Sequence, residues 1–68
     1  MKLYEFNLGD GWFGNIEYSV NGKHYTGTMY VTSEYSDGVS WASELDEYFQ
    51  TEEMMLDYCL KFIKVNNT

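Results

Sequence analysis

The stretch TEEMMLDYCLKFIKV, residues 51–65, decides the fold of this chain. On a helical wheel its apolar side chains gather on one broad face and its charged side chains on the other, which is the pattern of an amphipathic helix. The apolar face comprises Met55, Leu56, Cys59, Phe62 and Ile63, with Tyr58 and Leu60 at its flanks. We therefore predict a C-terminal helix that covers a sheet built from the residues before it.

Both ends of this predicted helix carry side chains that favour them. Thr51 can accept hydrogen bonds from the free N–H groups of the first turn, and Glu52 and Glu53 lie at the positive end of the helix dipole. Lys61 lies near the negative end and one turn after Asp57, so the two should form an ion pair worth a few tenths of a kcal/mol. These signals predict that the helix begins directly after Thr51.

Asn21-Gly22 is the strongest local signal upstream, because it lies between two β-rich runs and fits a two-residue type I′ turn. Such a turn predicts a hairpin with the pairs Val20–Lys23, Tyr18–Tyr25, Ile16–Gly27 and Gly14–Met29. This register gathers apolar residues on one face: Ile16, Tyr18, Val20, Tyr25, Met29 and Val31. The opposite face should be polar, apart from Phe13 across from Tyr30.

Two further segments complete the predicted sheet. Alternation over residues 2–8 predicts a first strand that Gly9-Asp10-Gly11 ends. Residues 39–50 fit either a strand, since Val39 and Trp41 alternate with serines, or a helix, since ASELDEYF contains good helix formers. We favour a fourth strand over residues 39–45, followed by a turn into the helix.

The resulting fold class is α+β: one domain, residues 1–68, with a small antiparallel sheet of three to four strands and the helix packed on one face. A single helix leaves the other face of the sheet uncovered. We expect Phe13 and Tyr30 on that uncovered face, with Trp12 or Trp41 nearby.

The net charge of −7 is concentrated in the second half of the chain. Residues 1–33 carry a net charge of −1 and residues 34–68 a net charge of −6, and no lysine or arginine lies between Lys23 and Lys61. Binding to nucleic acid or to an anionic membrane depends on cationic side chains, so this layout argues against both. It favours a basic protein partner.

The residue types that catalysis and metal binding need are scarce. The only histidine, His24, lies on the polar face of the predicted hairpin, whereas the only cysteine, Cys59, lies on the apolar face of the helix. A nucleophile and its base must be within hydrogen-bond reach, and metal sites need clustered ligands. Gly9, Gly11 and Gly14 match G-x-G-x-x-G, but a strand follows where a dinucleotide site needs a helix. We expect neither catalysis, nor a metal, nor a cofactor.

The N-terminus has no apolar signal-peptide run and no stretch has the length of a membrane span, so we expect a cytoplasmic protein. On a strand, Glu44 and Asp46 would point the same way about 6.6 Å apart, on the scale of successive backbone phosphates. The candidate partner-binding residues are Glu34, Asp37, Trp41, Glu44, Asp46, Glu47, Tyr48, Glu52, Glu53 and Asp57.

This acidic surface predicts a nucleic-acid mimic, an inhibitor that occupies a basic nucleic-acid-binding surface of its target. In size and charge alone, such a protein has the character of the compact anti-restriction and anti-CRISPR proteins of phages. The alternative is a module that self-associates as a homodimer through the uncovered sheet face. In that case the acidic half serves only solubility.

Overall fold

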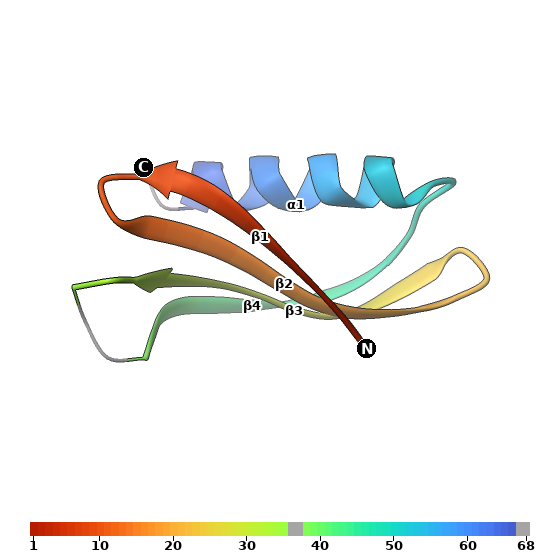
Figure 1. Ribbon diagram of the computed structural model, residues 1–68. Coiled ribbons are helices and arrows are strands. Elements are labelled where there is room, and N and C mark those ends of the chain that lie inside the picture. The colour runs from red at the N-terminus through yellow and green to blue at the C-terminus, as the bar shows by residue number, and fades with distance from the viewer. Residues whose placement is uncertain (36–37, 67–68) are drawn as a thin grey trace.

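The computed structural model describes residues 1–35 and 38–66, which form four strands followed by one helix. The elements are β1 (Lys2–Gly9), β2 (Trp12–Asn21), β3 (His24–Ser33), β4 (Val39–Tyr48) and α1 (Glu52–Asn66). The strands make one antiparallel sheet in the order β1-β2-β3-β4 (Figure 1). This arrangement confirms the predicted α+β fold.

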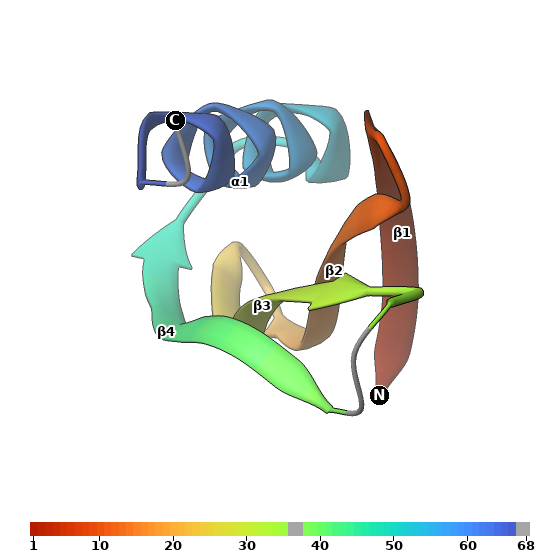
Figure 2. The same cartoon turned by 90° about the vertical axis from the view of Figure 1, so that its left-hand side faces the viewer.

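The sheet is strongly twisted and curves around one side of the helix, so that β1 and β4 lie at opposite flanks of α1 (Figure 2). The helix contacts β2 and β3 at the middle of the sheet. The core lies between these layers and consists of Ile16, Tyr18, Tyr25, Met29, Val31, Leu45, Met55, Cys59 and Ile63. Within the described residues, no helix is long and apolar enough to span a membrane.

The predicted helix start and helix face are both confirmed. The Met54 N–H donates a 3.2 Å hydrogen bond to Thr51 Oγ1, which satisfies one free donor of the first turn. Asp57 and Lys61 form the expected ion pair, with 3.0 Å between Oδ2 and Nζ. Cys59 is fully buried against the sheet, and this burial raises the pKa of its thiol to about 11.

The predicted β2–β3 hairpin is confirmed, but its predicted register is wrong. The two-residue turn is Gly22-Lys23, flanked by the pair Asn21–His24. Gly22 has a φ of 65° and stands at the first central position, where a type II′ turn favours glycine. The observed pairs are Val20–Tyr25, Tyr18–Gly27, Ile16–Met29, Gly14–Val31 and Phe13–Thr32. Because the error is two residues, each side chain keeps its predicted face.

Residues 39–48 form a strand, β4, which is three residues longer than the predicted strand over residues 39–45. Its Trp41 pairs with buried Val31, so the indole lies on the helix side and packs against Phe62 with 5.9 Å between ring centroids. Trp12 also lies on the helix side, because it is two residues before Gly14, against which Ile63 packs. The expectation that a tryptophan joins Phe13 and Tyr30 on the uncovered face was therefore wrong.

Candidate functional site

The side of the sheet that faces away from α1, named the open face below, carries four exposed carboxylates. Glu5 lies on β1, Glu17 on β2, and Glu44 and Asp46 on β4. Alternation along each strand places these side chains opposite the buried residues. Within the described residues, no lysine or arginine of a strand points to the open face. The open face is therefore an anionic surface drawn from three strands.

The register sets the spacing of these carboxylates. Glu17 and Glu44 pair with Thr28 from its two sides, so their backbones lie about 10 Å apart. Glu44 and Asp46 are about 6.6 Å apart along β4. Glu5 pairs with Asn15, which lies two residues before Glu17 on β2. Glu5 and Glu17 are therefore diagonal neighbours about 7–8 Å apart. The charges thus form a spaced array and not a close pair that shares one proton.

Neighbouring side chains hold two of these carboxylates. The Tyr30 hydroxyl donates a 2.7 Å hydrogen bond to Glu17 Oε1, and this bond raises the pKa of Tyr30, as do its burial and the charges of Glu17 and Glu5. At the other end of the open face, His24 Nε2 lies 2.5 Å from Asp46 Oδ1. These contacts limit the freedom of both carboxylates before any partner binds.

The His24 ring also stacks on Tyr48 with 4.4 Å between centroids. Cys59, in contrast, lies on the buried face of α1, on the other side of the sheet. The sheet therefore separates the two residues that a cysteine–histidine mechanism would need to bring together. In the part of the chain that the structure describes, no group of three or more His, Cys, Asp or Glu side chains could hold a metal ion.

Of the ten predicted partner-binding residues, the structure brings together three on the open face: Glu44, Asp46 and Tyr48. Trp41 lies beneath the helix, as described above. Glu47 pairs with buried Tyr25 and therefore also points to the helix side of the sheet. The predicted acidic residues of β4 are thus divided between its two faces.

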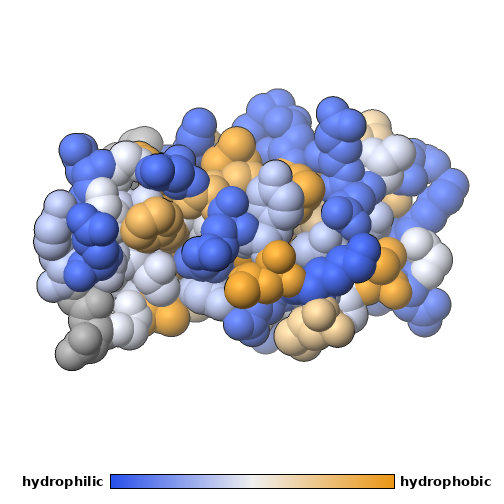
Figure 3. All heavy atoms as spheres, viewed as in Figure 1, coloured by the Kyte–Doolittle hydropathy of each residue, from blue (hydrophilic) through white to orange (hydrophobic). Residues whose placement is uncertain are grey.

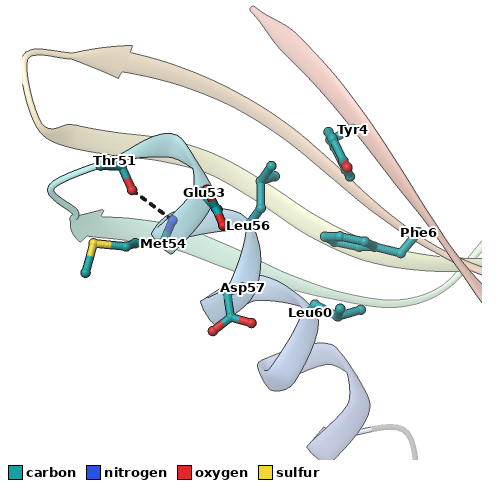
Figure 4. Close-up of a pocket in the computed structure, with 8 residues that line it drawn as sticks. All are labelled: Tyr4, Phe6, Thr51, Glu53, Met54, Leu56, Asp57 and Leu60. Carbon is teal, nitrogen blue, oxygen red and sulfur yellow. Dashed lines mark hydrogen bonds between the residues drawn. The ribbon is translucent and has the colours of Figure 1, made fainter.

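The other predicted residues lie elsewhere. Glu34 follows β3, where its N–H donates a 3.0 Å hydrogen bond to the Gly11 carbonyl oxygen, and Asp37 lies outside the described residues. Glu53 and Asp57 lie on the flank of α1 that faces β1 (Figure 4). The nine predicted residues that the structure describes therefore do not form a single surface.

Glu52, the first residue of α1, is held by two contacts. Lys2 Nζ donates a 3.2 Å hydrogen bond to Glu52 Oε2, and the Tyr18 hydroxyl is a second donor. Both contacts lower the pKa of the Glu52 carboxyl. In turn, burial and the Glu52 carboxylate raise the pKa of Tyr18 to about 12. Glu52 therefore ties the start of α1 to β1 and β2 and is not free for a partner.

Glu5 and Glu17 were missed by the sequence analysis, which looked for acidic residues only in the second half of the chain. Their signal was the strand alternation itself, which assigns Glu17 to the polar face of the hairpin and Glu5 to the polar side of the first strand. Only the register between strands shows that they lie on the same face as Glu44 and Asp46.

Comparisons with known proteins find a matching family and a similar phage protein. Residues 1–66 match a family described as "Family of unknown function (DUF5487)". The chain is 35% identical over 66 residues to the "Uncharacterized 8.2 kDa protein in Gp46-Gp47 intergenic region" of Enterobacteria phage T4, and the match covers 97% of each chain. No solved structure matches the chain.

Proposed function

We propose that this chain, which belongs to the family of unknown function DUF5487, is an acidic binding protein that occupies a basic nucleic-acid-binding surface of another protein. Bound there, it inhibits its target, in a role of the anti-restriction or anti-CRISPR kind. The observation that carries the proposal is the open face, where Glu5, Glu17, Glu44 and Asp46 lie without a lysine or arginine among the described residues.

The partner follows from the chemistry of this array. Surfaces that bind nucleic acid present lysine and arginine side chains to the phosphates, and spaced carboxylates can bind the same cations. The net charge of −7 accelerates encounter with such a surface. Glu17 and Asp46 are already held by Tyr30 and His24, so binding immobilises fewer free side chains.

The open face is less suited to self-association. Two copies joined through their open faces would bring two sets of four carboxylates together, and like charges at an interface oppose association. Phe13 and Tyr30, the aromatic residues expected to drive such contact, are each half-buried. These observations favour a basic partner over a second copy of this chain.

The test uses two variants with matched charge changes. One replaces Glu44→Gln and Asp46→Asn on the open face, and the control replaces Glu34→Gln and Glu47→Gln, which lie off that face. In both variants two carboxylates are replaced by amides of similar shape, so each variant loses two negative charges. Tagged wild type and both variants are incubated with nuclease-treated lysate of phage-infected bacteria, washed at low and high salt, and the retained proteins are identified.

A retained nucleic-acid-binding protein is then purified, and its binding to a labelled DNA duplex is measured with increasing amounts of each variant. We expect wild type and the control to displace the duplex and the open-face variant to displace it at least about tenfold less well, with the difference lost at high salt. If the two variants compete equally, or if the target binds this chain and the duplex at the same time, the proposal is wrong.

A further inference from the structure

A second surface lies between α1 and β1, on the opposite side of the sheet from the open face. Because the helix packs over β2 and β3, a groove of about 630 Å³ remains between its flank and β1. In Figure 3, which views this side of the molecule, hydrophobic residues are exposed among hydrophilic ones between the two elements. The groove is lined by Tyr4, Phe6, Thr51, Glu53, Met54, Leu56, Asp57 and Leu60.

The groove has an apolar floor and an acidic rim. Tyr4 and Phe6 reach from β1 towards Leu56 and Leu60 of the helix, and the Tyr4 and Phe6 rings lie 5.1 Å apart (Figure 4). Glu53 and Asp57 lie on the same flank of the helix and are both exposed, and Asp57 is paired with Lys61. An occupant that matches these surfaces carries apolar side chains for the floor, whereas acidic side chains beside Glu53 are disfavoured.

The backbone of β1 adds a third requirement. It is an outer strand of the sheet, and among the described residues no strand pairs with its outer edge. An outer strand presents unpaired N–H and C=O groups that can pair with an added strand. Both outer strands have a register shift, but β4 carries three acidic residues, Glu44, Asp46 and Glu47, and charged side chains discourage edge pairing. β1 is therefore the more accessible edge.

We propose that the outer edge of β1 binds an extended segment of a partner protein with alternating apolar and basic residues. The added strand places its apolar side chains in the groove, against Phe6 and Leu60. Its intervening basic side chains point to the other side of the sheet, where Glu5 lies. This inference does not depend on the proposed function: both use Glu5, but the edge and the groove of β1 can bind an extended segment whether or not the open face binds a basic surface.

An extended occupant fits this site better than a helix. A helix is about 10–12 Å wide with its side chains and satisfies its own backbone hydrogen bonds, so it would leave the edge of β1 unpaired. A strand satisfies that edge and still fills the groove with every second side chain. A second copy of this chain is disfavoured, because each copy carries a net charge of −7.

The probes are three short capped peptides: one alternating leucine and lysine, one alternating leucine and glutamate, and a leucine–lysine peptide N-methylated at alternate backbone nitrogens. Each is titrated into the full-length chain labelled for amide NMR. We expect the first peptide to shift the resonances of β1 and of the groove-facing flank of α1. The glutamate peptide should not bind, and N-methylation should weaken binding by about tenfold, because it removes strand hydrogen bonds.

Matched variants test whether the charge of Glu5 contributes to binding. Glu5→Gln should weaken binding of the leucine–lysine peptide by about threefold, whereas Glu34→Gln should leave it unchanged. Equal binding of the N-methylated peptide would overturn strand addition, and shifts confined to the open face would overturn the site. Sedimentation of the free protein must show a monomer; a dimer whose interface protects the β1 amides would mean that the occupant is a second copy.

Discussion

The Tyr30 hydroxyl donates its hydrogen bond to Glu17 Oε1 across the β2–β3 pair, with 2.7 Å between the two oxygens. This bond raises the pKa of Tyr30, because ionising the phenol would place a second negative charge beside Glu17 and lose the donated proton. Glu5 adds to the same effect from β1. The titration of Tyr30 therefore reports the electrostatic field of the open face.

We expect Glu17→Gln to lower the pKa of Tyr30 towards its ordinary value of 10.0, because the amide oxygen still accepts the hydrogen bond but carries no charge. Glu5→Gln should lower it by less. The measurement is an alkaline NMR titration of the Tyr30 ring, with Glu34→Gln as the control. An unchanged Tyr30 pKa in Glu17→Gln would show that the charge of Glu17 does not act on Tyr30.

Glu52 predicts how stability responds to acid. The hydrogen bonds from Lys2 and Tyr18 lower the pKa of this carboxyl in the folded state, so the unfolded chain binds the proton more tightly. Its stabilisation is therefore present above the ordinary pKa of 4.5 and is lost as the pH falls through the lower folded value. Wild type should melt at a higher temperature than Glu52→Gln at neutral pH.

This difference in melting temperature should shrink and then vanish as the pH falls below about 4.5, as followed by circular dichroism. Glu53→Gln is the matched control, since Glu53 is the next residue of the same first turn but borders the groove and not Lys2. A difference that stays constant across the acid range would mean that Glu52 stabilises the fold through packing and not through its charge.

Gly27 and Gly14 differ in what a side chain would meet. A β carbon at Gly27 would overlap the carbonyl oxygen of Glu17 and lie 2.7 Å from Tyr18 Cα, which are backbone atoms of the paired strand. At Gly14 it would lie 3.3 Å from Ile63 Cδ1 and 3.6 Å from Leu8 Cδ1, the ends of flexible side chains. Backbone of a central strand pair cannot move without losing hydrogen bonds, whereas side-chain ends can shift.

We therefore expect Gly27→Ala to lower the free energy of unfolding by about 3 kcal/mol or more and Gly14→Ala by about 1 kcal/mol. Urea titrations of both variants beside wild type measure the two values. A similar loss in both would indicate that β2 and β3 separate easily at Gly27, in conflict with the observed pairing of Tyr18 with Gly27.

Local patterns predicted most of the fold, because they are set by residues close in sequence. Thr51 and the apolar face that includes Met55 located the helix, and alternation assigned most side chains to the correct face. The hairpin register was wrong because Gly22 can occupy either central position of a two-residue turn. Moving the turn by one residue shifts the pairing by two, so the apolar pattern could not distinguish the alternatives.

The candidate site was harder to predict, because it depends on which strands lie side by side. Counting acids along the chain grouped Glu47 with Glu44, although strand alternation separates them. The same count omitted Glu17, which belongs to the nearly neutral half of the sequence but lies across Thr28 from Glu44. Charge clustering in the sequence is therefore a poor guide to charge clustering on a sheet.

Cys59 offers a test of how firmly α1 is packed. Its thiol is fully buried, burial raises its pKa to about 11, and its Sγ lies 3.6 Å from Met55 Sδ. A thiolate must be exposed to react, so modification of Cys59 requires the helix to leave the sheet or the whole chain to unfold. At neutral pH the folded protein should therefore react far more slowly with a thiol-specific reagent than the chain unfolded in urea.

Thr51→Ala removes the hydroxyl that accepts from the Met54 N–H and should cost about 1 kcal/mol. Since the helix must open for Cys59 to react, this variant should raise the modification rate about fivefold. The control is Thr28→Ala, an exposed change on the open face that removes no helix contact. If wild type reacts as fast as the unfolded chain, then α1 does not cover the sheet in solution, and the groove between α1 and β1 would lose one of its walls.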